Sequence, residues 1–110
     1  MIYETNSPTA IELYQGDTLD VKFTIEDEDD SPVDLTGWSV RFRVFGTDIL
    51  KSSAVAGEIT ITSVAGGIAT VHLIPADTTG LTQGYKYVYD GEIYNDEIVY
   101  TFAQGTFKIT

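Results

Sequence analysis

The stretch "VDLTGWSVRFRVF", residues 33–45, joins a turn signal to an alternating segment. Asp34 or Thr36 is placed to bond the backbone of the turn, and Gly37 permits a tight entry into the next element. From Trp38 onward, apolar and polar side chains alternate, which is typical of a β-strand with one buried face. We therefore expect this segment to be a strand that Trp38 anchors in the core.

The same period of two recurs along the whole chain. It marks "AIELY" (10–14), "LDVKFTIE" (19–26), "EITIT" (58–62), "IATVHLI" (68–74), "YKYVYDGEIY" (85–94), "IVYTF" (98–102) and "TFKIT" (106–110). Gly66-Gly67 predicts a tight hairpin turn, and Gly105 predicts a break before the last strand. Seven or eight strands without helical periodicity predict an antiparallel β-sandwich, with a small closed barrel as the competing all-β fold.

Two details favour an immunoglobulin-like sandwich. Trp38 lies on the buried face of the third strand, where such sandwiches hold a core tryptophan. Tyr87 stands six residues after a leucine, close to the spacing of a tyrosine corner. The segment 75–81 predicts a short helical turn before it, with Asp77 as the N-cap. The predicted fold is one immunoglobulin-like antiparallel β-sandwich of seven to eight strands that covers residues 1–110.

The charge balance excludes several classes of function. Seventeen acids oppose six scattered bases, for a net charge of −11. Binding to nucleic acid needs clustered Lys or Arg, and an anionic membrane would repel this chain, so we expect neither partner. The absence of cysteine excludes disulfides, thiolate catalysis and cysteine zinc sites. The first residues lack the pattern of a secretory signal, so we expect no Sec export.

The chemistry of an enzyme is not apparent in the sequence. His72 is the sole histidine, and alternation places it opposite Val71 and Leu73, facing solvent. A zinc site would need further His or Cys ligands. A pair of catalytic carboxylates needs a cleft that raises one pKa, whereas the acids here fall on turns and outer strand faces. We expect no catalysis and no cofactor.

The acid run 26–30 raises the question of a calcium site. Asp27, Asp29 and Ser31 have the alternate spacing that begins a calcium loop, and Asp34 could add an oxygen. However, Pro32 stands where such a loop needs glycine, and no closing acid follows. Asp27, Asp29 and Asp34 are therefore weak calcium candidates, and a solvated connection between two strands is the preferred interpretation.

Aromatic and apolar residues outside the predicted core suggest surfaces for contact. Alternation assigns Trp38, Phe23, Phe42, Tyr85, Tyr87 and Phe107 to the core. The loop 46–57 is more apolar than a free loop needs, which predicts an edge strand or a docking segment. Outer aromatics on a small all-β fold favour a protein contact, and a carbohydrate-binding or adhesion module is the alternative. The predicted contact residues are Tyr14, Phe45, Ile49, Leu50 and Tyr94.

The chain resembles a family of bacteriophage structural proteins. "IELYQGDTLDVKFTIEDEDDSPVDLTGWSVRFRV" (11–44) is similar to domains in which a GD-containing turn precedes a strand, a polar hairpin and a P-x-DLTG step. The N-terminal domains of siphophage baseplate upper proteins share this pattern. "GGIATVHLIPADTTGLTQGYKYVYDGEI" (66–93) and "VYTFAQGTFKIT" (99–110) look like its continuation. The resemblance covers about residues 11–110 of the sequence.

The resemblance implies an immunoglobulin-like domain of a virion that acts by protein–protein contacts, in the tail, in the baseplate or on the capsid. It implies other virion proteins as partners, and we expect several symmetric copies of the chain in the assembly. The resemblance carries no catalytic residues to transfer. Related chains have an Asx-Gly turn where this chain has "DEDDSP" (27–32), so we expect a different hairpin there. Baseplate upper proteins continue into further domains, whereas a stand-alone domain fits a capsid decoration protein or a tail accessory.

Overall fold

The structure is a computed structural model that describes residues 3–5 and 10–110. Within those residues the chain forms nine strands and one short helix. They are β1 (Tyr3–Thr5), β2 (Ala10–Leu13), β3 (Leu19–Asp27), β4 (Ser39–Val44), β5 (Leu50–Ser52), β6 (Ile59–Ser63), β7 (Ile68–Leu73), α1 (Pro75–Thr78), β8 (Lys86–Tyr94) and β9 (Val99–Ile109).

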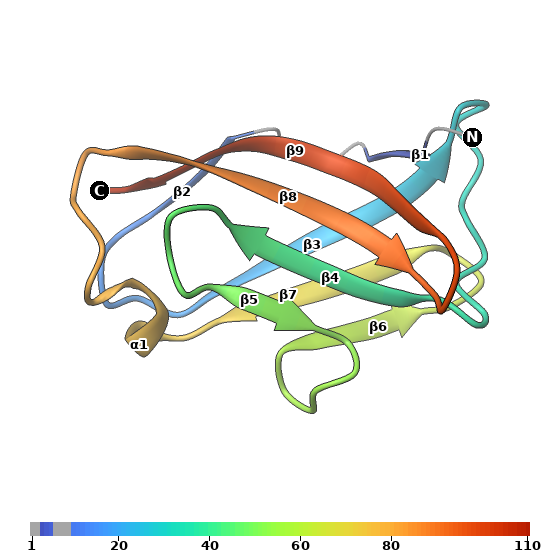
Figure 1. Ribbon diagram of the computed structural model, residues 1–110, viewed down its shortest axis with the longest axis horizontal. Helices are drawn as coiled ribbons and strands as arrows, with labels where there is room; N and C mark the ends of the chain where they lie inside the picture. The colour runs from blue at the N-terminus through green and yellow to red at the C-terminus, as the bar shows by residue number, and fades with distance from the viewer. Residues whose placement is uncertain (1–2, 6–9) are drawn as a thin grey trace.

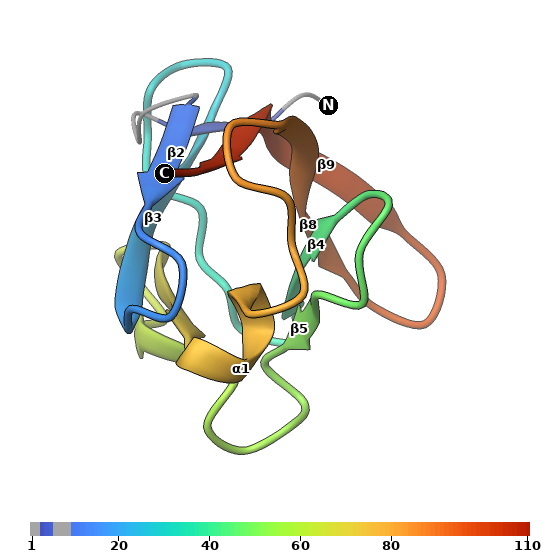
Figure 2. The same cartoon turned by 90° about the vertical axis from the view of Figure 1, so that its left-hand side faces the viewer.

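These strands form two sheets that face each other (Figures 1 and 2). In the described residues, one sheet has the order β1-β3-β7-β6 and the other has the order β2-β9-β8-β4-β5. The first order is the A-B-E-D sheet of an immunoglobulin fold, and β4, β8 and β9 take the places of strands C, F and G. The predicted all-β, immunoglobulin-like sandwich is confirmed, although the described residues form nine strands where seven to eight were predicted. One pair, β2 with β9, is parallel rather than antiparallel.

The core between the sheets is centred on aromatic rings. Phe42 and Tyr89 approach with ring centroids 5.4 Å apart, and Phe23 meets Phe102 edge-on at the same distance. Phe107 joins them from β9, and its ring centroid lies 6.5 Å from that of Phe42. All five rings are buried, so the inward positions of β3, β4, β8 and β9 supply the centre of the fold.

Two aromatic residues that the alternation placed in the core are not buried in it: Trp38 packs at its edge and Tyr85 lies outside it. β4 begins at Ser39, so Trp38 precedes the strand; its ring is half-buried and packs against Tyr100 at 5.7 Å. Leu35 is the residue of this turn that is buried in the core. Tyr85 precedes β8 and is exposed.

The predicted break at Gly105 is also wrong, because β9 runs without interruption from Val99 to Ile109. The change of phase occurs earlier, at a β-bulge. The register steps from Gly91↔Ala103 to Glu92↔Thr101, which leaves Phe102 as the extra residue of β9. Phe102 and Ala103 are consequently both buried, which no strict alternation would allow.

The tyrosine corner is present. The hydroxyl of Tyr87 accepts a hydrogen bond of 2.9 Å from the backbone N–H of Thr82. The predicted helical turn before it is α1, but its N-cap is Ile74. Asp77 lies three residues later, where its carboxylate accepts the backbone N–H of Ile74 at 2.8 Å.

Candidate interaction surface

The outward positions of β4 and β8 bring charged side chains of opposite sign together. Because both strands alternate, Arg41 and Arg43 of β4 point away from the core, as do Asp90 and Glu92 of β8. The register pairs Arg41 with Glu92 and Arg43 with Asp90 directly across the two strands. Opposite charges at facing positions stabilise a pair of strands.

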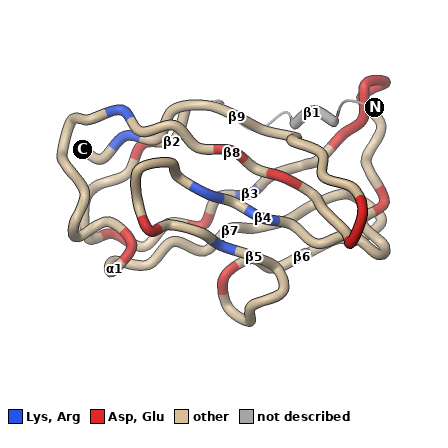
Figure 3. Tube along the Cα trace, in the orientation of Figure 1, with Lys and Arg blue, Asp and Glu red and all other residues tan. Residues whose placement is uncertain are grey.

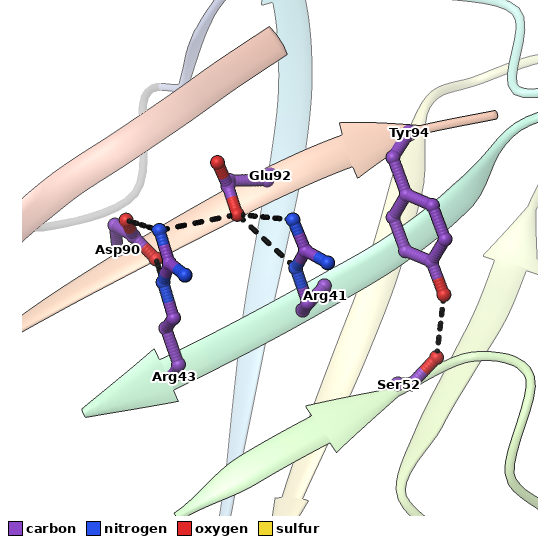
Figure 4. A network of polar contacts seen from close by, with 6 residues as sticks. All are labelled: Arg41, Arg43, Ser52, Asp90, Glu92 and Tyr94. Carbon is purple, nitrogen blue, oxygen red and sulfur yellow. Dashed lines mark hydrogen bonds and ion pairs between the residues drawn. The ribbon is translucent and has the colours of Figure 1, made fainter. Parts of the chain in front are cut away.

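The four side chains form one connected network, called here the charge ladder (Figure 4). Nε and Nη2 of Arg41 donate to Oε1 of Glu92 at 3.1 and 2.7 Å. Nε and Nη2 of Arg43 donate to the two oxygens of Asp90 at 2.9 and 3.1 Å, a bidentate arrangement. Nη2 of Arg43 also lies 3.5 Å from Oε1 of Glu92, which links the two pairs.

An aromatic ring flanks the charge ladder at each end. The guanidinium carbon of Arg43 lies 4.8 Å from the centroid of the Phe45 ring, and that of Arg41 lies 4.8 Å from the centroid of Tyr94. These are cation–π distances. The Tyr94 hydroxyl is 2.9 Å from the hydroxyl of Ser52 on β5, so this ring is held on both sides (Figure 4).

The carboxylates of the charge ladder are largely withdrawn from water although they lie on the outside of the sheet. Asp90 is 6% exposed and Glu92 is 7% exposed. The hydrogen bonds to Asp90 raise the pKa of Arg43 above its usual value and outweigh the opposing effect of burial. The four side chains of the charge ladder therefore sum to zero charge and are held together by hydrogen bonds.

Exposed apolar side chains surround the charge ladder. Phe45, Leu50, Val88 and Val99 are all exposed. Leu50, Val88 and Val99 occupy outward register positions of the same sheet, and Phe45 directly follows β4. Phe45 is held beside Val88 because its backbone N–H donates to the Val88 carbonyl at 2.8 Å. Aromatic residues and arginine are enriched in the cores of protein interfaces. We call the outward surface of the sheet β2-β9-β8-β4-β5 the five-stranded outer face.

The predicted contact residues divide into three groups. Phe45, Leu50 and Tyr94 come together on the five-stranded outer face. Ile49 does not, because its side chain is 4% exposed and packs in the core, so the prediction of a contact at Ile49 is wrong. Tyr14 is 67% exposed but follows β2, away from the charge ladder. The segment 46–57 does contain an edge strand, β5.

The weak calcium candidates are engaged in their own turns. Oδ1 of Asp27 accepts the backbone N–H groups of Asp29 and Ser31 at 2.9 and 3.1 Å. Oδ1 of Asp34 accepts both the N–H and the hydroxyl of Thr36, which lowers the pKa of Asp34. Across residues 3–5 and 10–110, no group of three or more His, Cys, Asp and Glu could hold a metal ion.

The sequence did not predict a further ion pair, which lies outside the charge ladder at the end of the sandwich beside α1. Lys51 faces inward from β5, and its Nζ lies 2.9 Å from Oδ2 of Asp77. The pair ties α1 to the edge of the five-stranded sheet. A hollow of about 390 Å³ adjoins it, between the β4–β5 turn and α1, with Asp48 and Asp77 in its lining. His72 is half-exposed and pairs with Asp20, in agreement with its predicted outward position.

Acidic side chains dominate the remaining surface. Figure 3 shows the acid run 26–30 at the far end of β3, whereas the arginines of β4 lie in the middle of the other sheet. No helix in the described part of the chain is long and apolar enough to cross a membrane. Comparison with protein-family models finds no match, and a search of curated proteins finds no relative.

Proposed function

We propose that this chain is a non-enzymatic structural protein of a phage virion that acts through contacts with other virion proteins. It serves as a capsid decoration or cement protein, or as a tail or baseplate accessory. Its place is the virion, after synthesis in the host cytoplasm. The sequence resemblance over residues 11–110 motivates the virion assignment.

The observation that supports a role in protein contact is the five-stranded outer face. Its charge ladder is held in place by paired hydrogen bonds, and Phe45 and Leu50 stand exposed beside it. An ordered surface of this kind loses little side-chain entropy when a partner covers it. The high negative charge of the rest of the chain keeps a particle exterior soluble and opposes attachment to nucleic acid.

Immunogold electron microscopy of purified phage particles tests this proposal, with antibody raised against the recombinant chain. Label over the heads would identify a decoration or cement protein, and label at the tail tip would identify a baseplate or tail part. Particles that contain the gene yet carry no label would overturn the virion assignment.

A carbohydrate-binding or adhesion module remains the second candidate because two tyrosines are unusually open. Tyr14 is 67% exposed and Tyr85 is 59% exposed, both near the end of the sandwich where the chain terminates. Tyr94 fits this role less well, since Arg41 covers one side of its ring. Glycan-array binding that is lost in both Tyr14→Ala and Tyr85→Ala, but kept in Val64→Ala, would favour this function. Wild-type protein that binds no glycan would exclude it.

A further inference from the structure

The charge of the molecule is unevenly divided between its surfaces. Four of the six bases and three of the seventeen acids occupy outward positions of the five-stranded sheet, which gives that face a formal charge of +1. The remaining fourteen acids and two bases give the rest of the chain −12. The charged residues of the face are Glu12, Arg41, Arg43, Lys86, Asp90, Glu92 and Lys108.

This division limits how two copies of the chain can meet. Any contact that brings acidic surfaces together is opposed by like-charge repulsion. The five-stranded outer face escapes that repulsion. Its carboxylates at Asp90 and Glu92 are already 6% and 7% exposed, so covering them removes little further hydration. The same face presents exposed Phe45, Leu50 and Val88 for apolar burial.

The pattern of charge on the face is also self-complementary. The arginines form a row on β4 and the acids form a parallel row on β8, in direct register. A two-fold axis that runs along the strands, between these rows, exchanges them in the second copy. Arg43 of one copy then faces Asp90 of the other, and Arg41 faces Glu92. Phe45 likewise faces Val88, its neighbour at the same level. A closed, isologous contact follows.

We propose that a second copy of this chain packs on the five-stranded outer face about this two-fold axis. The ladder carboxylates have lone pairs for both intramolecular and intermolecular donors. The nine residues of β8 extend about 30 Å, and five strands span about 20 Å, so the outline of the face is about 600 Å². Protruding side chains add to the accessible area of this outline, which brings it close to the ~800 Å² per partner of a stable interface.

This inference deepens the proposed function, since it identifies one partner as another copy of the same chain. The two can fail separately. Sedimentation of the purified chain reports self-association whether or not phage particles carry it, and immunogold labelling reports location whatever the oligomeric state.

Sedimentation equilibrium of the full chain over a range of concentrations is the first test. We expect a monomer–dimer equilibrium for the wild type. Phe45→Asp should weaken dimerisation by at least about tenfold, because it places a charge in an apolar contact. Thr60→Asp is the matched control, since it adds the same charge to an exposed position of the other sheet, on β6. A wild type that stays monomeric, or equal weakening by both variants, would overturn the proposal.

An exchange of charges tests the two-fold axis itself. The double variant Arg43→Asp/Asp90→Arg keeps the intramolecular pair and also keeps opposite charges across the proposed axis. Copies of this variant should dimerise with each other. In a mixture with wild type, like charges would meet at both positions, so native mass spectrometry should find mixed dimers well below the statistical half. A statistical proportion of mixed dimers would show that residue 43 of one copy does not face residue 90 of the other.

Discussion

The two outer faces of the sandwich arise from the same alternation yet differ in chemistry. On the β3–β7 face, Asp20 pairs with His72 in the open, and Thr24 and Thr70 continue a polar surface. On the other face, the arginines of β4 meet the acids of β8 and aromatic rings flank them. A solvent face needs only polar residues, whereas the charge ladder needs particular residues at facing positions.

The difference is also one of hydration. The side chain of Asp20 is 59% exposed, so water screens its attraction to His72. The side chains of Asp90 and Glu92 are 8% and 9% exposed and are paired with arginines, so their interactions are screened less. A charged residue on an outward strand position can therefore be either a solvated group or part of a hydrogen-bonded network that is largely shielded from water. The cross-strand partner decides which it is.

The largest effect should come from breaking the charge ladder. Glu92→Ala leaves the neighbouring Arg41 and Arg43 side chains of β4 without the shared oxygen at Oε1, and we expect a loss of about 2–3 kcal/mol in the free energy of unfolding. Asp20→Ala, which removes an exposed carboxylate from the opposite face, should cost below about 1 kcal/mol. Urea denaturation measures both. Equal losses would mean that the two faces do not differ energetically.

The packing on the inward side of β8, beneath the charge ladder, gives a second test. Gly91 lies between Asp90 and Glu92 and faces the core, and a Cβ there would lie 2.7 Å from Cζ of Phe102. Gly91→Ala should therefore destabilise the fold by about 1–3 kcal/mol through overpacking. Gly80→Ala is the control, because no atom of the described residues other than Gly80 and its two chain neighbours lies within 4 Å of the Cβ position there. Thermal unfolding compares the two, and an unchanged melting temperature for Gly91→Ala would contradict the close packing.

The smallest effect concerns the acid run at the end of β3. Asp27→Ala removes an acceptor of two backbone hydrogen bonds and should cost about 1 kcal/mol. Asp29 enters the turn through its backbone amide, so Asp29→Ala should stay within about 0.5 kcal/mol of wild type. Melting of the wild type should be the same with calcium and with chelator. A melting temperature raised by calcium would support the calcium hypothesis instead.

Much of the fold could be predicted because strand alternation and turn chemistry are local. The turn 34–37 behaves as its residues indicate: Asp34 bonds Thr36, and Gly37 adopts a positive φ of 79°. The errors of prediction occur where a strand ends or where a bulge shifts its register. Trp38 and Tyr85 lie just outside their strands, and the bulge at Phe102 shifts the phase of β9. Alternation contains no information about how far the facing sheet extends.

The candidate surface could be predicted only in part. Phe45 and Tyr94 were identified from their outward positions, and Leu50 and Ile49 from the apolar composition of the loop 46–57. Ile49 was misplaced because a loop residue can turn inward when its hairpin closes over the core. The outward orientation of Arg41 and Glu92 followed from the period of each strand. Their hydrogen bond did not, since 51 residues separate them along the chain.

The sequence by itself determined most of the strands, the inward side of each and the turn that begins β4, because these depend on neighbouring residues and on a period of two. Only the tertiary structure decided that β4 lies beside β8, in the register that sets Arg43 opposite Asp90. Pairing between distant strands is selected by packing of the whole core, where Phe42 and Tyr89 meet. The charge ladder is the outward consequence of that inward packing.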